Sequence, residues 1–453
     1  MKLELTDKQV LVLGLGDTGL SALRWLKRQG ARLSVADTRA TPPGIDAVRA
    51  EFPGIPVHLG PFKPAAFADV AVIVASPGVP LAEAEVQAAI ARGIPVVGDV
   101  ELFAQAIAGS KAKVIAITGS NGKSTVTSLA GHLCASAGLD TVIAGNIGLP
   151  VLDALTEREM TGEMPKVWVL ELSSFQLETT SSLRADAATV LNISADHMDR
   201  YAGLGEYAAA KQAIFQGCKV QVLNRDDAMT MAMRHGNSGV QTFGLQPGTT
   251  ASEWGLLERD GRRWLAKGHE RLFAVDELPI AGLHNAANAL AALALCRAIG
   301  LQYEPMLAAL KTFKGLAHRV EFVAEINGRK FYDDSKGTNV GATAAALKGF
   351  AEPVVLIAGG DGKGQDFTPL RDAVAKTRAV VQIGRDGPQI EKAIAGACHV
   401  QRAESMEEAV QQAYALSEPG DVVLLSPACA SWDMFRNYAH RAEVFINAVK
   451  ELQ

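Results

Sequence analysis

Cysteine is scarce in this sequence, and long hydrophobic runs are absent. The 453 residues include five scattered cysteines, none in a CxxC or other paired spacing. This usage argues against a disulfide framework or a zinc site and predicts buried thiols in a reducing cytoplasm. No apolar run reaches the ~18 residues of a membrane-spanning helix, and the first eight residues have no apolar signal core, so we expect no membrane insertion. The cysteines are Cys134, Cys218, Cys296, Cys398 and Cys429.

An excess of positive charge is also lacking. The formal net charge of −5 argues against a nucleic-acid partner, because a phosphate backbone requires a basic surface. With 48% hydrophobic and 21% charged residues, the composition is that of an ordinary soluble enzyme. The length is too great for one core and suggests about three domains.

Short apolar segments alternate with helical patterns, which predicts an α/β protein with mainly parallel sheets. We expect three domains, at residues 1–108, 109–314 and 315–453. A change of pattern over residues 239–279 predicts small antiparallel strands packed beside the main sheet. A helix is expected over 284–299. The other strands are expected at 10–13, 32–36, 70–75, 95–97, 141–144, 167–171, 189–193, 220–224, 353–358, 379–383 and 422–426.

The most informative segment is residues 115–125, where an apolar run leads into Gly119-Ser-Asn-Gly-Lys-Ser-Thr. It predicts a buried strand and a loop whose N–H groups surround an anion at a helix N-terminus. Lys123 would reach the terminal phosphates of a nucleotide, and Ser124 would bind magnesium. The general phosphate-loop pattern has Gly or Ala where Ile117 stands, so an ordinary glycine-containing turn is the alternative.

A second glycine-rich turn, at residues 14–19, follows the first expected strand. Gly14, Gly16 and Gly19, with Asp37 at the end of the next strand, fit a dinucleotide-binding pattern and favour a nicotinamide-dependent dehydrogenase. The physical requirement is narrower, namely a backbone that can approach a pyrophosphate. A uridine diphosphate meets it as readily as NAD does, so the turn leaves the nucleotide open.

Two polar segments follow strands of the second domain. Glu171 ends one strand, and His197 follows another, so both would lie beside the phosphate loop, on neighbouring strands, as ligands of a hard cation. Lys211 has the pattern of a surface lysine on a helix. Asn285 and Asn288 share one helix face, where a helix cap and an exposed amide are the simplest interpretation.

The third domain has four polar clusters, each after a strand or before a helix. They lie at 316–320, 333–339, 359–364 and 426–433. Lys363, on a glycine-rich turn, suits an anionic carboxylate. Each cluster by itself is also typical of a plain turn.

Together these residues resemble the Mur ligase family along essentially the whole chain. The resemblance rests on residues 117–125, 171–178, 196–199, 284–288 and 426–431, and the first of these is the family's own short phosphate loop. Residues 333–339 are similar to the members of the family that add D-glutamate.

The resemblance implies a Rossmann-like UDP-binding domain, a central P-loop-type ATPase domain and a Rossmann-like C-terminal domain. It implies an enzyme of peptidoglycan precursor synthesis, in which ATP phosphorylates the terminal carboxylate of UDP-N-acetylmuramoyl-L-alanine and the amine of D-glutamate attacks the acyl phosphate. ATP, two Mg²⁺ ions and a carbamylated Lys211 would be the cofactors. The partners would be these small molecules, and the protein would be a monomer.

The resemblance also assigns roles to residues. The catalytic residues would be Lys123, Glu171, His197 and Lys211, and the metal ligands Ser124, Glu171, His197 and carbamylated Lys211. The ATP-binding residues would be Gly119, Ser120, Asn121, Gly122, Lys123, Ser124, Thr125, Asn285, Asn288, Arg319, Asp334 and Lys336. The UDP-sugar would contact Asp17, Thr18, Thr38, Arg39, Gly78, Asn146 and Ser173, and D-glutamate would contact Thr338, Lys363, Ser431 and Tyr438.

Three other functions stay open at this point. One is another Mur-type or a folylpolyglutamate-type ligase, which shares the phosphate loop. A second is an NAD-dependent oxidoreductase. The third is a nucleotide-gated binding protein that binds ATP without amino-acid-dependent hydrolysis.

Overall fold

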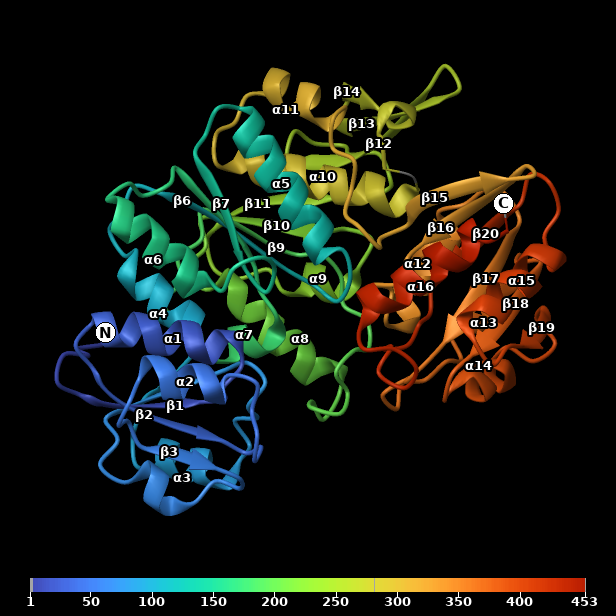
Figure 1. Cartoon of the computed structure of the whole chain (residues 1–453). Coiled ribbons are helices and arrows are strands. Elements are labelled where there is room, and N and C mark those ends of the chain that lie inside the picture. Colours follow the sequence, from blue (N-terminus) through green and yellow to red (C-terminus); the bar gives the residue numbers. More distant parts are fainter. Residues whose placement is uncertain (1–2, 281, 453) are drawn as a thin grey trace.

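The computed structural model describes residues 3–280 and 282–452. Three mostly parallel sheets follow one another along the chain and are covered by helices, which confirms the expected α/β class (Figure 1). The expected ends of the first and third domains, residues 1 and 453, lie outside the described residues. Among the helices described, none is long and apolar enough to cross a bilayer.

The first sheet has the order β3-β2-β1-β4-β5, and all its strands are parallel. Its strands are β1 (Gln9–Leu13), β2 (Arg32–Asp37), β3 (Val57–Leu59), β4 (Val72–Ala75) and β5 (Val96–Val97). The helices of this region are α1 (Asp17–Arg28), α2 (Ile45–Glu51), α3 (Ala84–Ala91) and α4 (Asp99–Ala106), with a short 3-10 turn, η1 (Pro64–Phe67).

The central sheet has nine strands in the order β14-β13-β12-β11-β10-β9-β6-β8-β7. They are β6 (Lys113–Thr118), β7 (Thr141–Gly145), β8 (Val167–Glu171), β9 (Ala187–Val190), β10 (Val220–Asn224), β11 (Gly239–Phe243), β12 (Glu253–Arg259), β13 (Arg262–Lys267) and β14 (Glu270–Ala274). Its helices are α5 (Lys123–Ser136), α6 (Val151–Thr161), α7 (Ser174–Glu178), α8 (Leu204–Gln212), α9 (Ala228–Ala232), α10 (Leu283–Ala298) and α11 (Tyr303–Leu310), with 3-10 turns η2 (Ala213–Phe215) and η3 (Val275–Glu277).

Two expectations for this region are wrong. Within residues 239–279, β13 is antiparallel to β12 and to β14, as predicted. However, β11 pairs in parallel with β10 and β12, so all four strands extend the main sheet. The strand predicted at 189–193 ends at Val190. The chain leaves the sheet there because Asn192 bonds to the glycine-rich loop: its carbonyl oxygen accepts the N–H of Ser120 at 2.9 Å, and its Oδ1 accepts that of Asn121 at 2.8 Å.

The third sheet has the order β15-β16-β20-β17-β18-β19, and only the pairing of β15 with β16 is antiparallel among the strands described. The strands are β15 (Glu321–Ile326), β16 (Arg329–Asp333), β17 (Val354–Gly359), β18 (Ala379–Ile383), β19 (His399–Arg402) and β20 (Val422–Leu425). The helices are α12 (Val340–Lys348), α13 (Leu370–Val374), α14 (Gly387–Ala393), α15 (Met406–Leu416) and α16 (Tyr438–Lys450).

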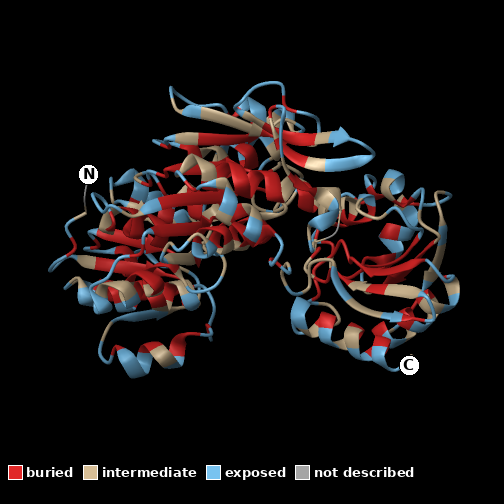
Figure 2. Cartoon of the chain, turned by 90° about the horizontal axis from the view of Figure 1, so that it is seen from above, coloured by how far each residue is buried: buried red, intermediate tan, exposed pale blue. Residues whose placement is uncertain are grey.

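The buried apolar clusters are not confined to one sheet each. One buried cluster joins the first sheet to the central one, and the ring of Phe103 from α4 packs edge-on against Trp168 of β8 at 5.0 Å. The two buried clusters of the third sheet draw their described residues from 326 onward. The buried residues of this C-terminal part accordingly form a centre of their own in Figure 2. The first and central parts therefore share one buried cluster besides a cluster of their own in each, whereas the buried clusters of the third part lie wholly within it.

Four of the five cysteines are buried, as expected. Cys398 is only half-buried, so the expectation of buried thiols is wrong at this position. The sulfur atoms of Cys134 and Cys296 lie 3.9 Å apart as free thiols between α5 and α10.

Candidate functional site

The phosphate loop joins the carboxyl end of β6, an interior strand of the central sheet, to α5. Ile117 is a buried strand residue paired with Glu171, which explains why an apolar side chain stands where other phosphate loops have glycine. Gly122 has a φ of 84° and precedes the first residue of α5, Lys123. The Lys123 Nζ folds back and donates to the carbonyl oxygens of Gly119 and Ser120, at 2.9 Å each. The loop thus has the form of an anion cradle with its cation in place.

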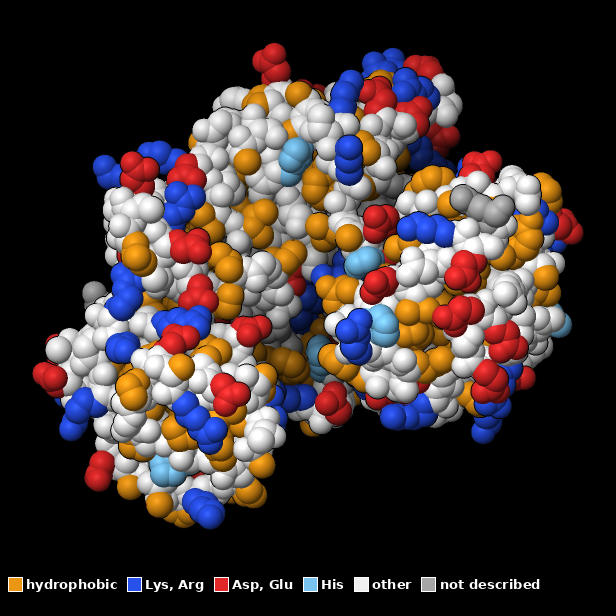
Figure 3. Space-filling model, viewed as in Figure 1, with side chains coloured by type: hydrophobic (Ala, Val, Ile, Leu, Met, Phe, Trp, Pro, Cys, Tyr) orange, Lys and Arg blue, Asp and Glu red, His pale blue; other side chains and the backbone are white. Residues whose placement is uncertain are grey.

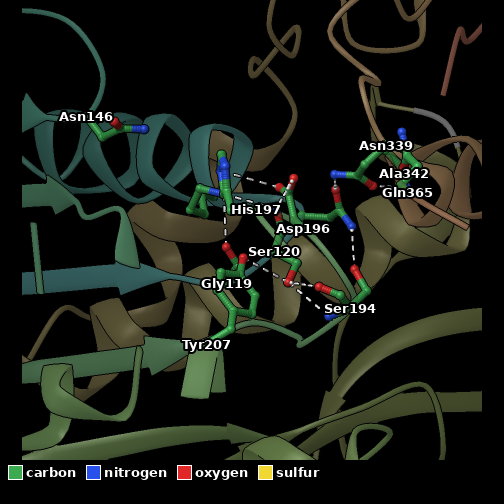
Figure 4. A network of polar contacts seen from close by, with 12 residues as sticks. Gly119, Ser120, Asn146, Ser194, Asp196, His197, Tyr207, Asn339, Ala342 and Gln365 are labelled. Carbon is green, nitrogen blue, oxygen red and sulfur yellow. Dashed lines mark hydrogen bonds and ion pairs between the residues drawn. The ribbon is translucent and has the colours of Figure 1, made fainter. Parts of the chain in front are cut away.

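The segment after β9 fixes the loop from one side. The Ser120 hydroxyl donates to the carbonyl of Ser194 and accepts the N–H of the same residue, both at 2.9 Å. The Tyr207 hydroxyl lies 3.2 Å from the same oxygen. These groups converge in Figure 4, with His197 and Asp196 close by. The loop and the segment that carries His197 therefore form one unit.

Glu171 ends β8 beside this loop. Its side chain is 2% exposed, and its Oε1 accepts a hydrogen bond from the Asn146 side chain at 2.8 Å. The other oxygen, Oε2, is buried and has no hydrogen-bond partner among the described residues. A buried carboxylate oxygen without a partner is costly, so this atom is suited to a cation ligand.

His197 follows β9 and has a φ of 57°, a left-handed conformation that is uncommon outside glycine. Its Nε2 lies 3.7 Å from an oxygen of Asp196, and its ring meets that of Phe175 edge-on at 4.8 Å. Burial lowers the pKa of the imidazole, which favours the neutral form that binds metals. We expected the strands that precede Glu171 and His197 to be neighbours in the sheet. This is wrong, because β6 lies between β8 and β9.

Lys211 lies on α8 and is 1% exposed, so the surface interpretation is wrong. Its Nζ donates to the Thr118 hydroxyl at 3.2 Å and lies 4.7 Å from the centre of the Tyr207 ring. Burial, reinforced by the charge of Lys123, lowers the pKa of the amine well below its usual value. In the sequence only the family resemblance indicated a functional role for Lys211, because the surrounding Tyr-Ala-Ala-Ala-Lys does not indicate which helix face is buried.

The charged groups act on one another as a single cluster. Burial lowers the pKa of Lys123, while the carboxylates of Glu171 and Asp196 act to raise it. The same two carboxylates act on Lys211. In Figure 3 the surface is hollowed where the three parts of the chain meet, and Lys or Arg side chains are visible in the hollow. The catalytic and metal-binding candidates are therefore brought together around the phosphate loop.

A cavity between α10, the phosphate loop and α12 gathers most of the other expected ATP contacts. Burial raises the pKa of Asp334 to about 7, although its Oδ2 accepts the Ser426 hydroxyl at 2.7 Å. The expectation of a helix cap and an exposed amide at this face is wrong, because Gly282 caps α10, Asn285 is buried and Asn288 is half-buried. The expected residues that line the cavity are Asn121, Gly122, Thr125, Asn285, Asn288, Arg319 and Asp334.

His284 also lines this cavity and was not expected there. Burial lowers the pKa of its ring to about 4, so the ring is neutral near pH 7. Lys336 is not among the lining residues, but the charges of Glu171 and Lys123 act on it. The Asn339 side chain donates to Asn121 at 3.1 Å, which places the third part of the chain directly against the phosphate loop (Figure 4).

A second cavity lies at the ends of the first sheet and of β7. Six of the seven residues expected at the UDP-sugar line it: Asp17, Thr18, Thr38, Arg39, Gly78 and Asn146. Ser173 is not among the lining residues. It caps α7, and its hydroxyl accepts the N–H of Gln176 at 3.2 Å. Gln176 lines the cavity although its sequence position showed only the capping pattern.

Asp37 separates the two interpretations of the first glycine-rich turn. Its Oδ2 accepts the N–H of Leu15 at 2.7 Å, and both its oxygens accept hydrogen bonds from the Arg39 guanidinium, at 2.8 and 2.6 Å. Burial would raise the pKa of this carboxyl, but these bonds outweigh it and lower the pKa. In a dinucleotide site the corresponding acid binds ribose hydroxyls. Here the carboxylate also lines the cavity, beside Arg39, but both its oxygens are engaged by protein donors. This favours the sugar-nucleotide interpretation of the turn.

The residues expected at D-glutamate lie on three loops of the third part. Lys363 is exposed, has a φ of 52°, and acts electrostatically on His197 across the hollow. Ser431 is buried, Thr338 is half-buried, and Tyr438 begins α16. The Tyr438 ring lies 5.3 Å from the Nζ of Lys336. Of the four, only Lys363 has an electrostatic effect on a candidate metal ligand among the described residues, and none lines either cavity.

Family models match three consecutive stretches of the chain. Residues 8–98 match the Mur ligase MurD-like N-terminal domain, residues 117–296 the Mur ligase middle domain, and residues 318–429 the Mur ligase glutamate ligase domain. The chain belongs to the Mur ligase family.

Relatives of the same length support this membership. The chain is 63% identical to the UDP-N-acetylmuramoylalanine--D-glutamate ligase of Methylobacillus flagellatus, over 100% of this chain and 98% of the relative. It is 56% identical to the enzyme of the same name from Nitrosomonas europaea, over 99% and 97%.

Solved structures share the fold of the chain at low identity. MurF from Acinetobacter baumannii superposes with a TM-score of 0.62 at 18% identity, over 98% of this chain and 93% of that one. UDP-N-acetylmuramate-alanine ligase MurC from Thermotoga maritima gives 0.60 at 19% identity, over 98% and 100%.

Proposed function

We propose that this chain is an ATP-dependent carbon–nitrogen ligase that joins D-glutamate to UDP-N-acetylmuramoyl-L-alanine in cytoplasmic peptidoglycan precursor synthesis. The observation that carries the proposal is the 63% identity, over the full chain, to a relative named UDP-N-acetylmuramoylalanine--D-glutamate ligase. Residues 333–339, which resemble the D-glutamate-adding members, include Asp334 of the ATP-side cavity.

The residues around the phosphate loop fit ATP and magnesium. The unpartnered Oε2 of Glu171, the buried hydroxyl of Ser124 and the neutral ring of His197 are ligands of the type that Mg²⁺ accepts. We propose that these groups hold two Mg²⁺ ions on the ATP phosphates. Magnesium bound there neutralises charge on the phosphoryl group during transfer.

Lys211 would complete this ligand set as a carbamate. Burial lowers the pKa of this amine and so favours its neutral form, which can attack carbon dioxide, form an N–C bond and release a proton. The product is a carboxylate on a side chain that the structure places beside the phosphate loop. The positive charge of Lys123 disfavours a protonated amine at Lys211, whereas a carbamate anion there would be attracted to that charge.

The roles of the chain's own residues follow from their positions. Lys123 would stabilise negative charge on the transferred phosphoryl group, and the N–H groups of Gly119 to Gly122 would orient it. The cavity at the ends of the first sheet and of β7 would hold the sugar nucleotide, with Arg39 and the turn at residues 14–19 on its phosphates. Lys363, Thr338, Ser431 and Tyr438 would orient D-glutamate so that its amine meets the acyl phosphate.

The three functional domains are proposed at residues 1–108, 109–314 and 315–453. The shared core of the first two supports a fixed relation between the sugar-nucleotide cavity and the phosphate loop. The separate core of the third supports movement of the D-glutamate residues against that unit during turnover. We propose that the enzyme acts as a monomer, because each of the expected sites is formed within one chain.

An ADP-release assay tests the function. The purified chain, with ATP, Mg²⁺ and UDP-N-acetylmuramoyl-L-alanine, should release ADP with D-glutamate and not with L-glutamate. Assays with UDP-N-acetylmuramate plus L-alanine, and with a folate plus L-glutamate, serve as controls. Turnover in either control without turnover on D-glutamate would reject the proposal. ATP binding with no amino-acid-dependent hydrolysis would indicate a binding protein instead.

A further inference from the structure

Arg200 lies between the UDP-side cavity and the segment that carries His197. One of its terminal nitrogens donates to the carbonyl oxygen of Pro77, and the other to that of Val79, both at 3.0 Å. Residues 77–79 follow β4 and form one wall of the cavity. A guanidinium that holds two carbonyls of one short loop fixes both the position and the tilt of that loop, because its donors are planar and rigid.

The guanidinium is itself held on its other sides. It lies over the ring of Phe175, 4.2 Å from the ring centre, and its second nitrogen lies 3.4 Å from an oxygen of Glu178. The other oxygen of Glu178 accepts the Tyr201 hydroxyl at 2.5 Å. The Arg200 side chain is 14% exposed. An arginine with a stacked ring, a paired carboxylate and two carbonyl acceptors has little freedom to leave this position.

The same residues reach the expected metal site. The N–H of Arg200 donates to the carbonyl of His197 at 2.9 Å. Phe175, which supports the guanidinium on its face, also meets the His197 ring edge-on at 4.8 Å. The wall of one cavity and an expected ligand of the other site are thus both attached to Arg200, the first through its side chain and the second through its backbone N–H.

We propose that Arg200 is a positioning residue that couples the sugar-nucleotide cavity to the magnesium site. It is not among the residues lining either cavity. It acts through the backbone of Pro77 to Val79 and through the loop of His197. The inference rests on the proposed function, because the coupling matters only if a sugar nucleotide and ATP react across this boundary.

The test is Arg200→Met, which keeps apolar contact with Phe175, removes every side-chain donor and leaves the backbone bond to His197 in place. We expect the KM for UDP-N-acetylmuramoyl-L-alanine to rise about tenfold or more, as for the loss of charged hydrogen bonds. We also expect kcat to fall, and the KM for ATP to change by less than about twofold. Arg200→Lys keeps the charge and can reach one carbonyl, so its KM should lie between those of Arg200→Met and the wild type.

A matched control is Arg184→Met. Arg184 also donates to two backbone carbonyls, those of Ser181 and Leu183, at 2.8 and 3.0 Å, and lines neither cavity. Arg184→Met should leave the KM values for the sugar nucleotide, ATP and D-glutamate unchanged. A variant that had merely lost structure would show a lower kcat with unchanged KM values, because fewer molecules would be active. Thermal melting of each variant is recorded alongside.

The outcomes separate this inference from the function itself. Wild-type turnover with D-glutamate, together with a wild-type sugar-nucleotide KM in both Arg200 variants, would overturn the inference and leave the function standing. No wild-type turnover would reject the function. If Arg200→Met does not fold, Arg200→Lys decides in the same assay, and a KM like that of the wild type would count against the coupling.

Discussion

The chain contains two glycine-rich turns that look alike in sequence and differ in chemistry. Both join a buried strand to a helix, β1 to α1 and β6 to α5. The first helix begins with Asp17, and the second with Lys123 folded over its own loop. A cation at the helix start suits a triphosphate, whereas the first turn offers only backbone N–H groups.

The packing of the two turns differs as well. In the first, a Cβ on Gly19 would lie 1.9 Å from the carbonyl oxygen of Gly14, so this glycine serves close packing of helix on strand. In the second, Gly122 needs its positive φ of 84° to start α5. Glycine spacing therefore predicts a turn whose backbone can approach a phosphate group. The charged residues around the turn decide which nucleotide binds there.

Lys123→Ala is the strongest test of whether the two turns bind different nucleotides. Turnover should fall by about 10³-fold or more, because a charge that stabilises the transferred phosphoryl group is lost. The affinity for UDP-N-acetylmuramoyl-L-alanine, measured by calorimetry, should stay within about twofold, since that cavity belongs to the first turn. Loss of both would show that the two turns do not act separately.

A second change addresses the buried lysine behind the phosphate loop. Lys211→Ala should lower kcat by about 10²-fold or more, because the proposed carbamate ligand of the metal would be lost. Added acetate or formate should restore part of it by taking the place of the carbamate. Lys219→Ala is the control, since Lys219 is exposed and pairs with Asp186 at 2.8 Å. Unchanged activity in Lys211→Ala would contradict the assignment.

A third change tests the first turn. Arg39→Ala should raise the KM for the sugar nucleotide about tenfold and leave the KM for ATP unchanged, since a charged donor to phosphate is lost. Arg24→Ala is the matched control, because Arg24 also pairs bidentately with a carboxylate of the first part, Glu51, at 2.7 Å. A larger effect on ATP than on the sugar nucleotide would reverse the assignment of the two turns.

A fourth change concerns the buried cluster that joins the first part of the chain to the central part. Burial raises the pKa of Asp99, at the start of α4, to about 6 from 3.8. The folded state therefore holds this proton more tightly, and Asp99 makes the unfolding free energy fall as pH rises from about 4 to 6, by up to ~3 kcal/mol.

Asp99→Asn lacks this titration. Its unfolding free energy relative to the wild type should therefore grow between pH 4.5 and pH 6.5, as measured by urea denaturation at several pH values. A difference that stays constant with pH would show that Asp99 does not titrate as expected. Asp46→Asn is the control, because Asp46 is exposed, with 93% of its side chain accessible.

Much of the fold could be predicted from the pattern of apolar segments. The predicted strands in the first and central sheets were found near their expected positions, because each is a short apolar run ended by glycine, proline or a polar residue. The β15–β16 hairpin was missed, although its Asn327-Gly328 turn between two apolar segments was a usable signal. β19 was missed because its sequence, His-Val-Gln-Arg, has little apolar character.

The sequence by itself determined the family, the parallel α/β sheets and the phosphate loop. Apolar periodicity and glycine spacing are properties of short segments, so they can be read without knowing which segments pack together. Only the tertiary structure decided that Lys211 is buried, that Arg39 engages Asp37, and that Arg200 connects two sites. Burial and charge pairing depend on segments far apart in the chain, such as residues 77 and 200. No local pattern can encode which of them will meet.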